Sequence, residues 1–346
     1  YILRWYSTGD NTRWYIADDG DADGSQCGNV IIQSASASAS ASASASESLS
    51  ASESASDVIL ETFNNYVTLQ DKVYTLNNDF TFESNPNLSL DDLNGYTFDG
   101  NNYKITYSES DDWTGLFQPA MGVIATIQNI ELNSSTPIAQ YYGGIIGRGY
   151  YFVDDETYLN YEDSEVIIDN CHVYADVSNG SSGGIVGTYF GSGSSNCIIS
   201  NCSSAGVISG KSAGGIGGYR VGGQGTVEIS NCYTIGEISG NNAGGICGKG
   251  AGDLEGGSVT VTNCYTTGDI SGESAGGICG HQAGYKQGNV TVANCYTIGE
   301  ISGEGAGGIC GYEAGSQEGS VNISNCYTTG DIVTQNAGGI CGLMAG

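Results

Sequence analysis

The sequence predicts an all-β protein built as a parallel β-solenoid, or β-helix, of stacked coils. Three observations support this class: a unit repeats along the chain, each unit holds three short extended runs, and no segment shows a capped helical period. The repeat is marked by an Asn that recurs in steps of 31, 30, 32, 31 and 31 residues, at Asn170, Asn201, Asn231, Asn263, Asn294 and Asn325. Units this short cannot bury an apolar face alone, so they must stack on one another.

Each regular unit is predicted to be one coil. In one of them Ser258 to Thr266 alternates apolar and β-branched residues with polar ones, Gly268 to Ser271 is a second run and Ala275 to Gly280 a third. Glycine clusters between the runs supply the turns. The side chains expected to point inward are Val259, Val261, Ile270 and Ile278. The usual crossover rule predicts a right-handed coil.

The chain divides into four predicted regions. Residues 1–33 form an N-terminal hairpin or small β module, with candidate strands at 3–7 and 13–17, that serves assembly or binding. Residues 34–56 are Ser/Ala-rich and of low complexity, either a flexible linker or an O-glycosylated stalk. Residues 57–139 are the irregular opening coils and cap, and residues 140–346 are the regular repeats. The O-glycosylation candidates are Ser34, Ser36, Ser38, Ser40, Ser42, Ser44 and Ser46.

The composition limits the partners of the chain. Acidic residues outnumber Lys and Arg by 38 to 9, and the net charge of -29 disfavours binding to nucleic acid or an anionic membrane. The apolar runs, such as Val30 to Ile32, are far shorter than the roughly 20 residues that span a bilayer, so no membrane insertion is expected. Twelve cysteines in an acidic chain indicate an oxidising, extracellular or cell-surface location.

The repeat resembles that of a known family. "GGICGKG", "GGICGHQ", "GGIVGTY" and "GGIIGRG", each after a run such as "NCYTTGDISG", are similar to the GLUG-motif repeats of β-solenoid surface proteins and adhesins. The resemblance covers roughly residues 88–346. It implies a solenoid that builds surface architecture without a shared catalytic set. The chain departs from the family pattern where Cys replaces the usual Val, at Cys247, Cys279, Cys310 and Cys341.

Two columns of cysteine recur fifteen residues apart. They pair as Cys232 with Cys247, Cys264 with Cys279, Cys295 with Cys310, and Cys326 with Cys341. Four disulfides across the coils are one interpretation, and a ladder of buried thiols is an equally weighted one. Bonds between stacked coils are a third, because parallel neighbours lie about 4.8 Å apart. A zinc site is disfavoured, since no Cys-x-x-Cys occurs and the chain has only two His.

Three further columns follow from the repeat. The Asn column predicts a ladder of stacked amides at a turn. The Tyr column is either an aromatic stack or a platform for sugar rings, and comprises Tyr233, Tyr265, Tyr296 and Tyr327. The acidic column, either a solvated face or a set of cation sites, comprises Glu237, Asp269, Glu300 and Asp331.

Two other patterns indicate ligands or modification. Asp19, Asp21 and Asp23, followed by Gly24, have the alternating carboxylates of a calcium loop, although an EF-hand would need Glu where Val30 stands. A solvated acidic turn is the alternative. Candidate N-glycosylation sites are Asn87, Asn133, Asn179, Asn289 and Asn322.

The sequence favours a structural function. The four Arg are scattered and the carboxylates repeat without a unique pair, so no enzyme, and no cofactor other than calcium, is expected. The predicted function is an extracellular fibre subunit that assembles head-to-tail with copies of itself through its N-terminal segment and solenoid ends. The alternative is a cell-surface adhesin that binds glycans or a partner surface with the help of calcium.

Overall fold

The computed structural model of the chain describes residues 2–8, 11–17, 58–86, 88–153, 156–159, 163–193 and 195–345. The chain forms two compact units, Tyr1–Glu47 and Ser48–Gly346. In the first, β1 (Ile2–Thr8) pairs antiparallel with β2 (Asn11–Ala17), and Trp5 lies opposite Trp14. These strands contain the two segments that the sequence analysis proposes for a hairpin.

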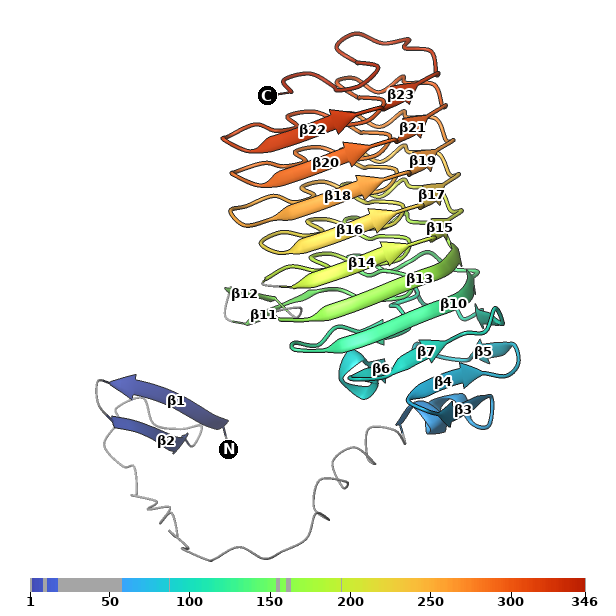
Figure 1. Cartoon of the computed structure of the whole chain (residues 1–346), viewed down its shortest axis with the longest axis vertical. Coiled ribbons are helices and arrows are strands. Elements are labelled where there is room, and N and C mark those ends of the chain that lie inside the picture. Colours follow the sequence, from blue (N-terminus) through green and yellow to red (C-terminus); the bar gives the residue numbers. More distant parts are fainter. Residues whose placement is uncertain are drawn as a thin grey trace, which may run out of the picture. The chain divides into compact units, whose positions relative to one another are not determined.

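The second unit is a parallel β-solenoid of coils about 31 residues long, which confirms the predicted fold class (Figure 1). One stack of strands contains β7 (Thr97–Asp99), β10 (Ile124–Ser134), β13 (Glu165–Tyr174), β14 (Asn196–Ser200), β16 (Thr226–Ser230), β18 (Ser258–Thr262), β20 (Asn289–Ala293) and β22 (Ser320–Ser324). The next stack runs from β8 (Lys104–Tyr107) through β10 and β13 to β15 (Ser203–Ser204), β17 (Tyr233–Thr234), β19 (Tyr265–Thr266), β21 (Tyr296–Thr297) and β23 (Tyr327–Thr328).

Single bridges continue the stacking around the rest of each coil. Ile238, Ile270 and Ile301 pair in register on one wall, and Cys247, Cys279 and Cys310 do so on another. Equivalent residues of successive coils therefore lie directly above one another on every wall.

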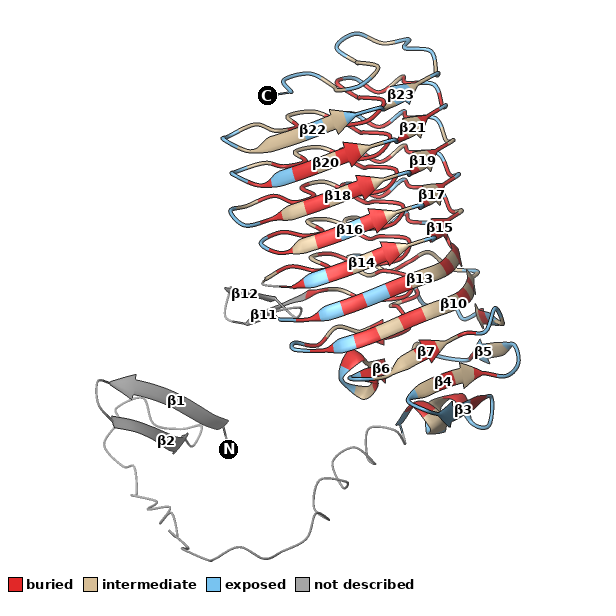
Figure 2. Ribbon diagram, in the orientation of Figure 1, coloured by how far each residue is buried: buried red, intermediate tan, exposed pale blue. Residues whose placement is uncertain are grey.

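The core has the alternation that the sequence predicts. Along β18 every second residue is buried, and Val259, Val261, Ile270 and Ile278 are all 0–1% exposed. Burial repeats in the same places from coil to coil, as the red bands of β16, β18 and β20 show (Figure 2). The four predicted inward positions are confirmed.

The backbone conformation explains why Asn recurs at this position in each coil. Asn231, Asn263, Asn294 and Asn325 have φ of 53° to 56° at the corner between the two strand stacks. Asn tolerates this left-handed conformation better than other residues with a side chain. Steric crowding explains why two glycines recur together. A Cβ on Gly244 would collide with the carbonyl oxygen of Cys247, and a Cβ on Gly245 would collide with the carbonyl oxygen of Gly277.

A short helix covers the first of the opening coils. Residues 58–63 are helical, and their Ile59 and Phe63 are fully buried. The Phe63 ring lies 5.0 Å from that of Phe80 and 5.2 Å from that of Phe98. The remaining elements of this region are β3 (Val67–Gln70), β4 (Val73–Leu76), β5 (Phe80–Phe82), β6 (Leu88–Ser89), the 3-10 helix η1 (Leu90–Leu93) and β9 (Phe117–Gln118). Because β3 pairs antiparallel with β4, the parallel stacking stops there.

Two local features complete the solenoid unit. Between two coils, β11 (Tyr150–Val153) and β12 (Glu156–Leu159) form an antiparallel hairpin. In the coil of β22 and β23, Ile332 and Ile340 are 47% and 37% exposed, whereas the matching Ile301 and Ile309 are fully buried. Among the described residues, no helix is long and apolar enough to cross a membrane.

Candidate functional site

Several predicted site residues lie outside the part of the chain that the structure describes. These are the calcium candidates Asp19, Asp21 and Asp23, the seven O-glycosylation candidates from Ser34 to Ser46, and Asn87. Within the described residues, no group of three or more His, Cys, Asp or Glu side chains could hold a metal ion.

The cysteine columns are ladders of thiols. Every described cysteine is free, so the predicted disulfides among Cys232, Cys247, Cys264, Cys279, Cys295, Cys310, Cys326 and Cys341 are absent there. In the column that begins with Cys232, each Sγ lies close to the carbonyl oxygen of the residue two positions earlier. Cys264 Sγ lies 3.2 Å from the Thr262 carbonyl oxygen and accepts the backbone N–H of Cys232 at 3.4 Å. The thiols therefore act as small buried apolar groups with weak hydrogen bonds, the alternative that the sequence left open.

Burial lowers the reactivity of the inner thiols. Burial raises the pKa of the Cys197 thiol to about 12. The pKa of Cys232 is also raised, by burial and by its hydrogen bond with Cys202. Because the thiolate is the nucleophile and the metal ligand, neither group serves as one near neutral pH.

Two ladders stiffen the outside of the solenoid. Asn263 Nδ2 donates to Asn231 Oδ1, and Asn294 Nδ2 donates to Asn263 Oδ1, both at 3.3 Å. The rings of Tyr265 and Tyr296 stack with centroids 5.0 Å apart and planes 3° apart. Stacked rings cover each other's faces, so the inner members of the Tyr column offer no flat platform to a sugar.

The acidic column faces solvent. Glu237, Asp269, Glu300 and Asp331 are exposed. Asp269 Oδ1 accepts the backbone N–H of Glu300 at 2.8 Å, and Glu237 Oε1 accepts the Ser271 hydroxyl at 2.8 Å. Hydrogen bonds along the column thus offset part of the repulsion between like charges.

The candidate N-glycosylation sites differ in how accessible the Asn side chain is. Asn179 Nδ2 donates to Asp112 and to the Ile138 carbonyl oxygen, and Asn133 Nδ2 donates to Glu131. Asn289 and Asn322 are exposed on β20 and β22. Their side chains offer an accessible amide, as glycosylation requires.

A histidine and serine pair lies outside the residues that the sequence pattern indicates. His172 Nδ1 lies 2.8 Å from Ser203 Oγ, since β13 and β15 place the two residues in register. A nucleophilic site also needs a third group that orients the histidine. Glu131 is the register neighbour of His172, but it binds Lys104 at 3.1 Å and Asn133 at 3.1 Å. The pair therefore lacks its third member among the described residues.

A hollow of about 250 Å³ lies just beyond this pair on the same face. Its lining consists of Ser134, Ser135, Thr136, Pro137, Tyr174, Ala175, Asp176, Ala205 and Gly206. The polar groups there serve the backbone: Thr136 Oγ1 donates to the Asp111 carbonyl oxygen, and Asp176 Oδ1 accepts the Val207 N–H. They do not converge on the hollow as a catalytic set would.

A second missed feature is a column where the repeat varies. The two residues after each Gly-Gly-x-x-Gly from Gly183 onward differ from coil to coil, and we name them the variable column. They are Thr188-Tyr189, Tyr219-Arg220, Lys249-Gly250, His281-Gln282, Tyr312-Glu313 and Leu343-Met344. Backbone bonds stack them, from Arg220 N to Lys249 O at 2.9 Å and from Gly250 N to His281 O at 2.9 Å. The detectable signal was this departure from an otherwise constant repeat.

Arg220 of the variable column forms an ion pair with Asp253, which lies three residues after Gly250. Arg220 Nε lies 2.8 Å from Asp253 Oδ2, and Arg220 Nη1 donates to the Tyr189 hydroxyl at 3.0 Å. The guanidinium also lies 5.1 Å from the centre of the Tyr219 ring. Asp253 is 3% exposed, and its Oδ1 has no partner among the described residues. Burial raises the pKa of Asp253 to about 6, against the attraction of Arg220.

Lys249 and His281 follow Arg220 along the column. Burial lowers the pKa of Lys249, and the nearby charges of Arg220 and Lys211 lower it further. Burial and Lys249 lower the pKa of His281 to about 4, although Glu313 opposes this shift. His281 is thus neutral at pH 7, with its Nδ1 buried and unpartnered among the described residues.

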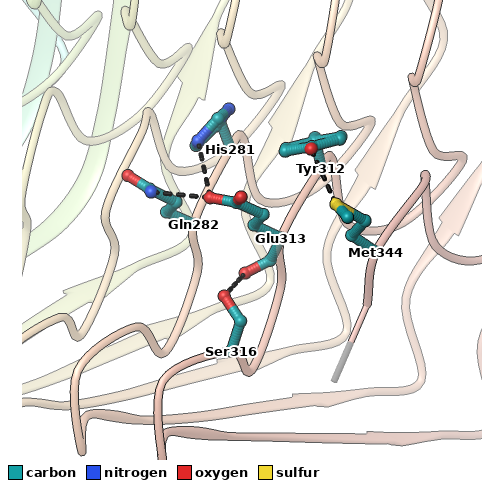
Figure 3. Close-up of polar contacts among 6 residues, drawn as sticks. All are labelled: His281, Gln282, Tyr312, Glu313, Ser316 and Met344. Atoms are coloured by element: carbon teal, nitrogen blue, oxygen red, sulfur yellow. Dashed lines mark hydrogen bonds and ion pairs between the residues drawn. The ribbon is translucent and has the colours of Figure 1, made fainter.

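The next coils hold Glu313 between polar neighbours (Figure 3). Glu313 Oε2 lies 3.6 Å from His281 Nε2 and accepts from Gln282 Nε2 at 2.8 Å. Beside them, the Tyr312 hydroxyl lies 2.8 Å from the sulfur of Met344. The variable column therefore presents aromatic, cationic and amide groups in sequence, one coil apart.

Comparisons with known proteins give a structural likeness. No protein-family model matches the chain. The curated proteins contain no match either. A solved structure described as "a putative immunoglobulin A1 protease from Bacteroides ovatus" is 21% identical, with a TM-score of 0.38, over 74% of this chain and 68% of that one.

Proposed function

We propose that the chain is an extracellular structural protein, the subunit of a surface filament. The observation that carries this proposal is the set of uninterrupted ladders in which Asn, Tyr and Cys repeat in register from coil to coil. Such ladders give a stiff scaffold whose coils contact only their neighbours. The GLUG-like repeat supports the same role, because proteins with that repeat build surface architecture.

The proposed assembly step is strand addition between the N-terminal segment of one copy and a solenoid end of the next. Among the described residues, the candidate edge is the coil of β22 and β23, where Ile332 and Ile340 are exposed, because the first coil is covered by residues 58–63 and the antiparallel β3. The β1–β2 hairpin is a two-stranded sheet, and such a hairpin is marginally stable alone. We therefore assign the hairpin of a second copy to this edge.

Electron microscopy of the full chain tests the proposal, with Ile332→Lys as the blocking variant. Ile298→Lys is the matched control, since Ile298 is also 47% exposed but lies on the outer side of an inner coil. We expect filaments from the wild type and the control, and single particles from Ile332→Lys. Single particles from all three proteins, with and without calcium, contradict the proposal.

The second candidate is a surface adhesin that binds glycans, with calcium held by Asp19, Asp21 and Asp23. The variable column favours it, because aromatic and polar side chains vary there from coil to coil on a scaffold that is otherwise constant. A role without catalysis belongs to both candidates.

A further inference from the structure

We propose that the hollow beside Tyr174 is a binding site for one ring of a neutral saccharide. This site rests on the second candidate function, the adhesin, and it does not require filament assembly. Three observations carry it: a gap of one ring in the outer face of the solenoid, a lining of hydroxyl and carboxylate groups, and the absence of cations from that lining.

The hollow exists because one coil lacks a bulky side chain. The backbone N–H of Ala205 donates to the Val173 carbonyl oxygen at 3.0 Å. The backbone N–H of Ile235 donates to the Ser204 carbonyl oxygen at 3.3 Å. Ala205 therefore lies between Tyr174 and Ile235, which are 46% and 52% exposed. Since parallel neighbours lie about 4.8 Å apart, these two walls are roughly 10 Å apart.

The gap has room for one ring. In the neighbouring Tyr column, the ring of Tyr265 lies 5.1 Å from that of Tyr233 and 5.0 Å from that of Tyr296. A ring over Ala205 would have the same spacing from its two walls. The hollow of about 250 Å³ is smaller than the pockets of roughly 300–1,000 Å³ that hold drug-sized ligands, so it suits one ring of a longer ligand.

The polar lining is held in place by the fold. Ser134, Ser135 and Thr136 line one side of the hollow, and Asp176 lines another. Thr136 Oγ1 donates to a backbone carbonyl oxygen at 2.9 Å, and Asp176 Oδ1 accepts the Val207 N–H at 3.0 Å. A hydroxyl has two acceptor positions and a carboxylate about four, so these groups can accept further hydrogen bonds from a ligand. Fixed acceptors beside an exposed aromatic ring match the hydroxyls and the flat face of a sugar.

The charge around the hollow disfavours an acidic ligand. The lining contains Asp176 and no Lys or Arg. The same holds for the surrounding coil segments, whose only charged residues besides Asp176 is Glu131, and which span 131–137, 172–179 and 203–208. Glu131 is paired with Lys104 at 3.1 Å. An acidic ligand would therefore meet a carboxylate of its own sign, whereas a neutral saccharide would not.

The test is saturation-transfer NMR of the full-length chain with four neutral trisaccharides: cellotriose, maltotriose, xylotriose and mannotriose. We expect at least one of them to bind with a Kd of about 1 mM or tighter. Ala205→Ile should weaken that binding about tenfold or more, because it fills the gap as Ile235 and Ile298 do in their own coils. Thr267→Ile is the matched control, since Thr267 has the equivalent position two coils away, and it should bind as the wild type does.

Two results contradict the site directly: no binding of any neutral trisaccharide, and binding that persists in Ala205→Ile. Trigalacturonic acid and the glucosamine trimer test the charge, and equal or tighter binding of either one contradicts a neutral ligand. Thermal unfolding shows whether each variant is folded, and Tyr174→Ala, at an exposed position, should also weaken binding about tenfold. Ile332→Lys should bind the saccharide normally, so a failure of filament assembly and a failure of this site are separate results.

Discussion

Opposed titrations set the pH response of the variable column. The pKa of Asp253 is raised to about 6 by burial, so between roughly pH 4 and 6 the folded chain binds more protons there than the unfolded chain. Its contribution to stability therefore falls as pH rises. The pKa of His281 is lowered to about 4 by burial and Lys249, so the folded chain binds fewer protons there up to about pH 6.5. Its contribution rises with pH.

Replacing His281 by Gln isolates one of these two effects. We expect the wild type to gain about 2 kcal/mol in free energy of unfolding relative to His281→Gln between pH 4 and 6.5. Urea unfolding over a series of pH values measures this difference. The control is His172→Gln, which lies in the strand stack that carries the Tyr column, away from the variable column. A difference independent of pH would show that His281 titrates normally in the folded state.

The unpartnered oxygen of Asp253 gives a second prediction at the residue scale. A Cβ on Gly223 would lie 3.3 Å from Asp253 Oδ1 and 3.6 Å from Ser192 Oγ. Ser192 and Ser316 occupy the equivalent position in other coils. Gly223→Ser should therefore donate a hydrogen bond to Oδ1 and raise the free energy of unfolding by about 1 kcal/mol. Gly223→Ala, which adds the Cβ alone, is the control in thermal unfolding, and equal effects would refute the hydrogen bond.

Within one coil, Asn at the corner contributes to stability through its backbone conformation and through its side-chain hydrogen bonds, and the two contributions can be separated. Asn263 has φ of 55° and takes part in two ladder bonds of 3.3 Å. Asn263→Gly keeps the conformation and should cost about 1 kcal/mol, whereas Asn263→Ala loses both and should cost about 2 kcal/mol. Urea unfolding gives both values. Equal losses would mean that the left-handed conformation adds no cost.

The thiol ladder predicts a graded reactivity along the solenoid. Cys279 and Cys310 are fully buried, while Cys326 and Cys341 are half-exposed in the coil of β22 and β23. We expect iodoacetamide to label the latter two first in the native chain, and the buried thiols only after unfolding. Mass spectrometry of the unreduced protein provides the check. A mass lower by two hydrogens for each Cys pair would restore the disulfide interpretation.

At the scale of the molecule, each coil is an interchangeable slab. Removing residues 263–293 joins Thr262 to Asn294 and preserves the register of Val259 with Val321 through the shared column. The shortened chain should fold. Its free energy of unfolding should depend less steeply on urea concentration, because unfolding exposes the surface of one coil less. Far-UV circular dichroism during urea unfolding measures both properties. Removing only 263–278 shifts the register by half a coil, and this control should not fold.

The sequence by itself determined the solenoid, because the inward residues Val259, Val261, Ile270 and Ile278 recur at a spacing that only stacking can bury. It likewise fixed the corner, since Asn recurs where the backbone needs a left-handed residue. It could not decide the state of the cysteines: spacing is equally compatible with disulfides and with thiols, and the choice depends on the direction of each Sγ in three dimensions.

Only the tertiary structure brought together the variable column. Tyr189, Arg220, Lys249 and His281 are separated by about 31 residues along the chain, and each is unremarkable in its own loop. Stacking places them one coil apart, and it also brings the buried Asp253 next to Arg220, with which it forms an ion pair. The physical reason is that a repeat specifies where the backbone goes, whereas charge, burial and hydrogen bonding between coils depend on which side chains become neighbours.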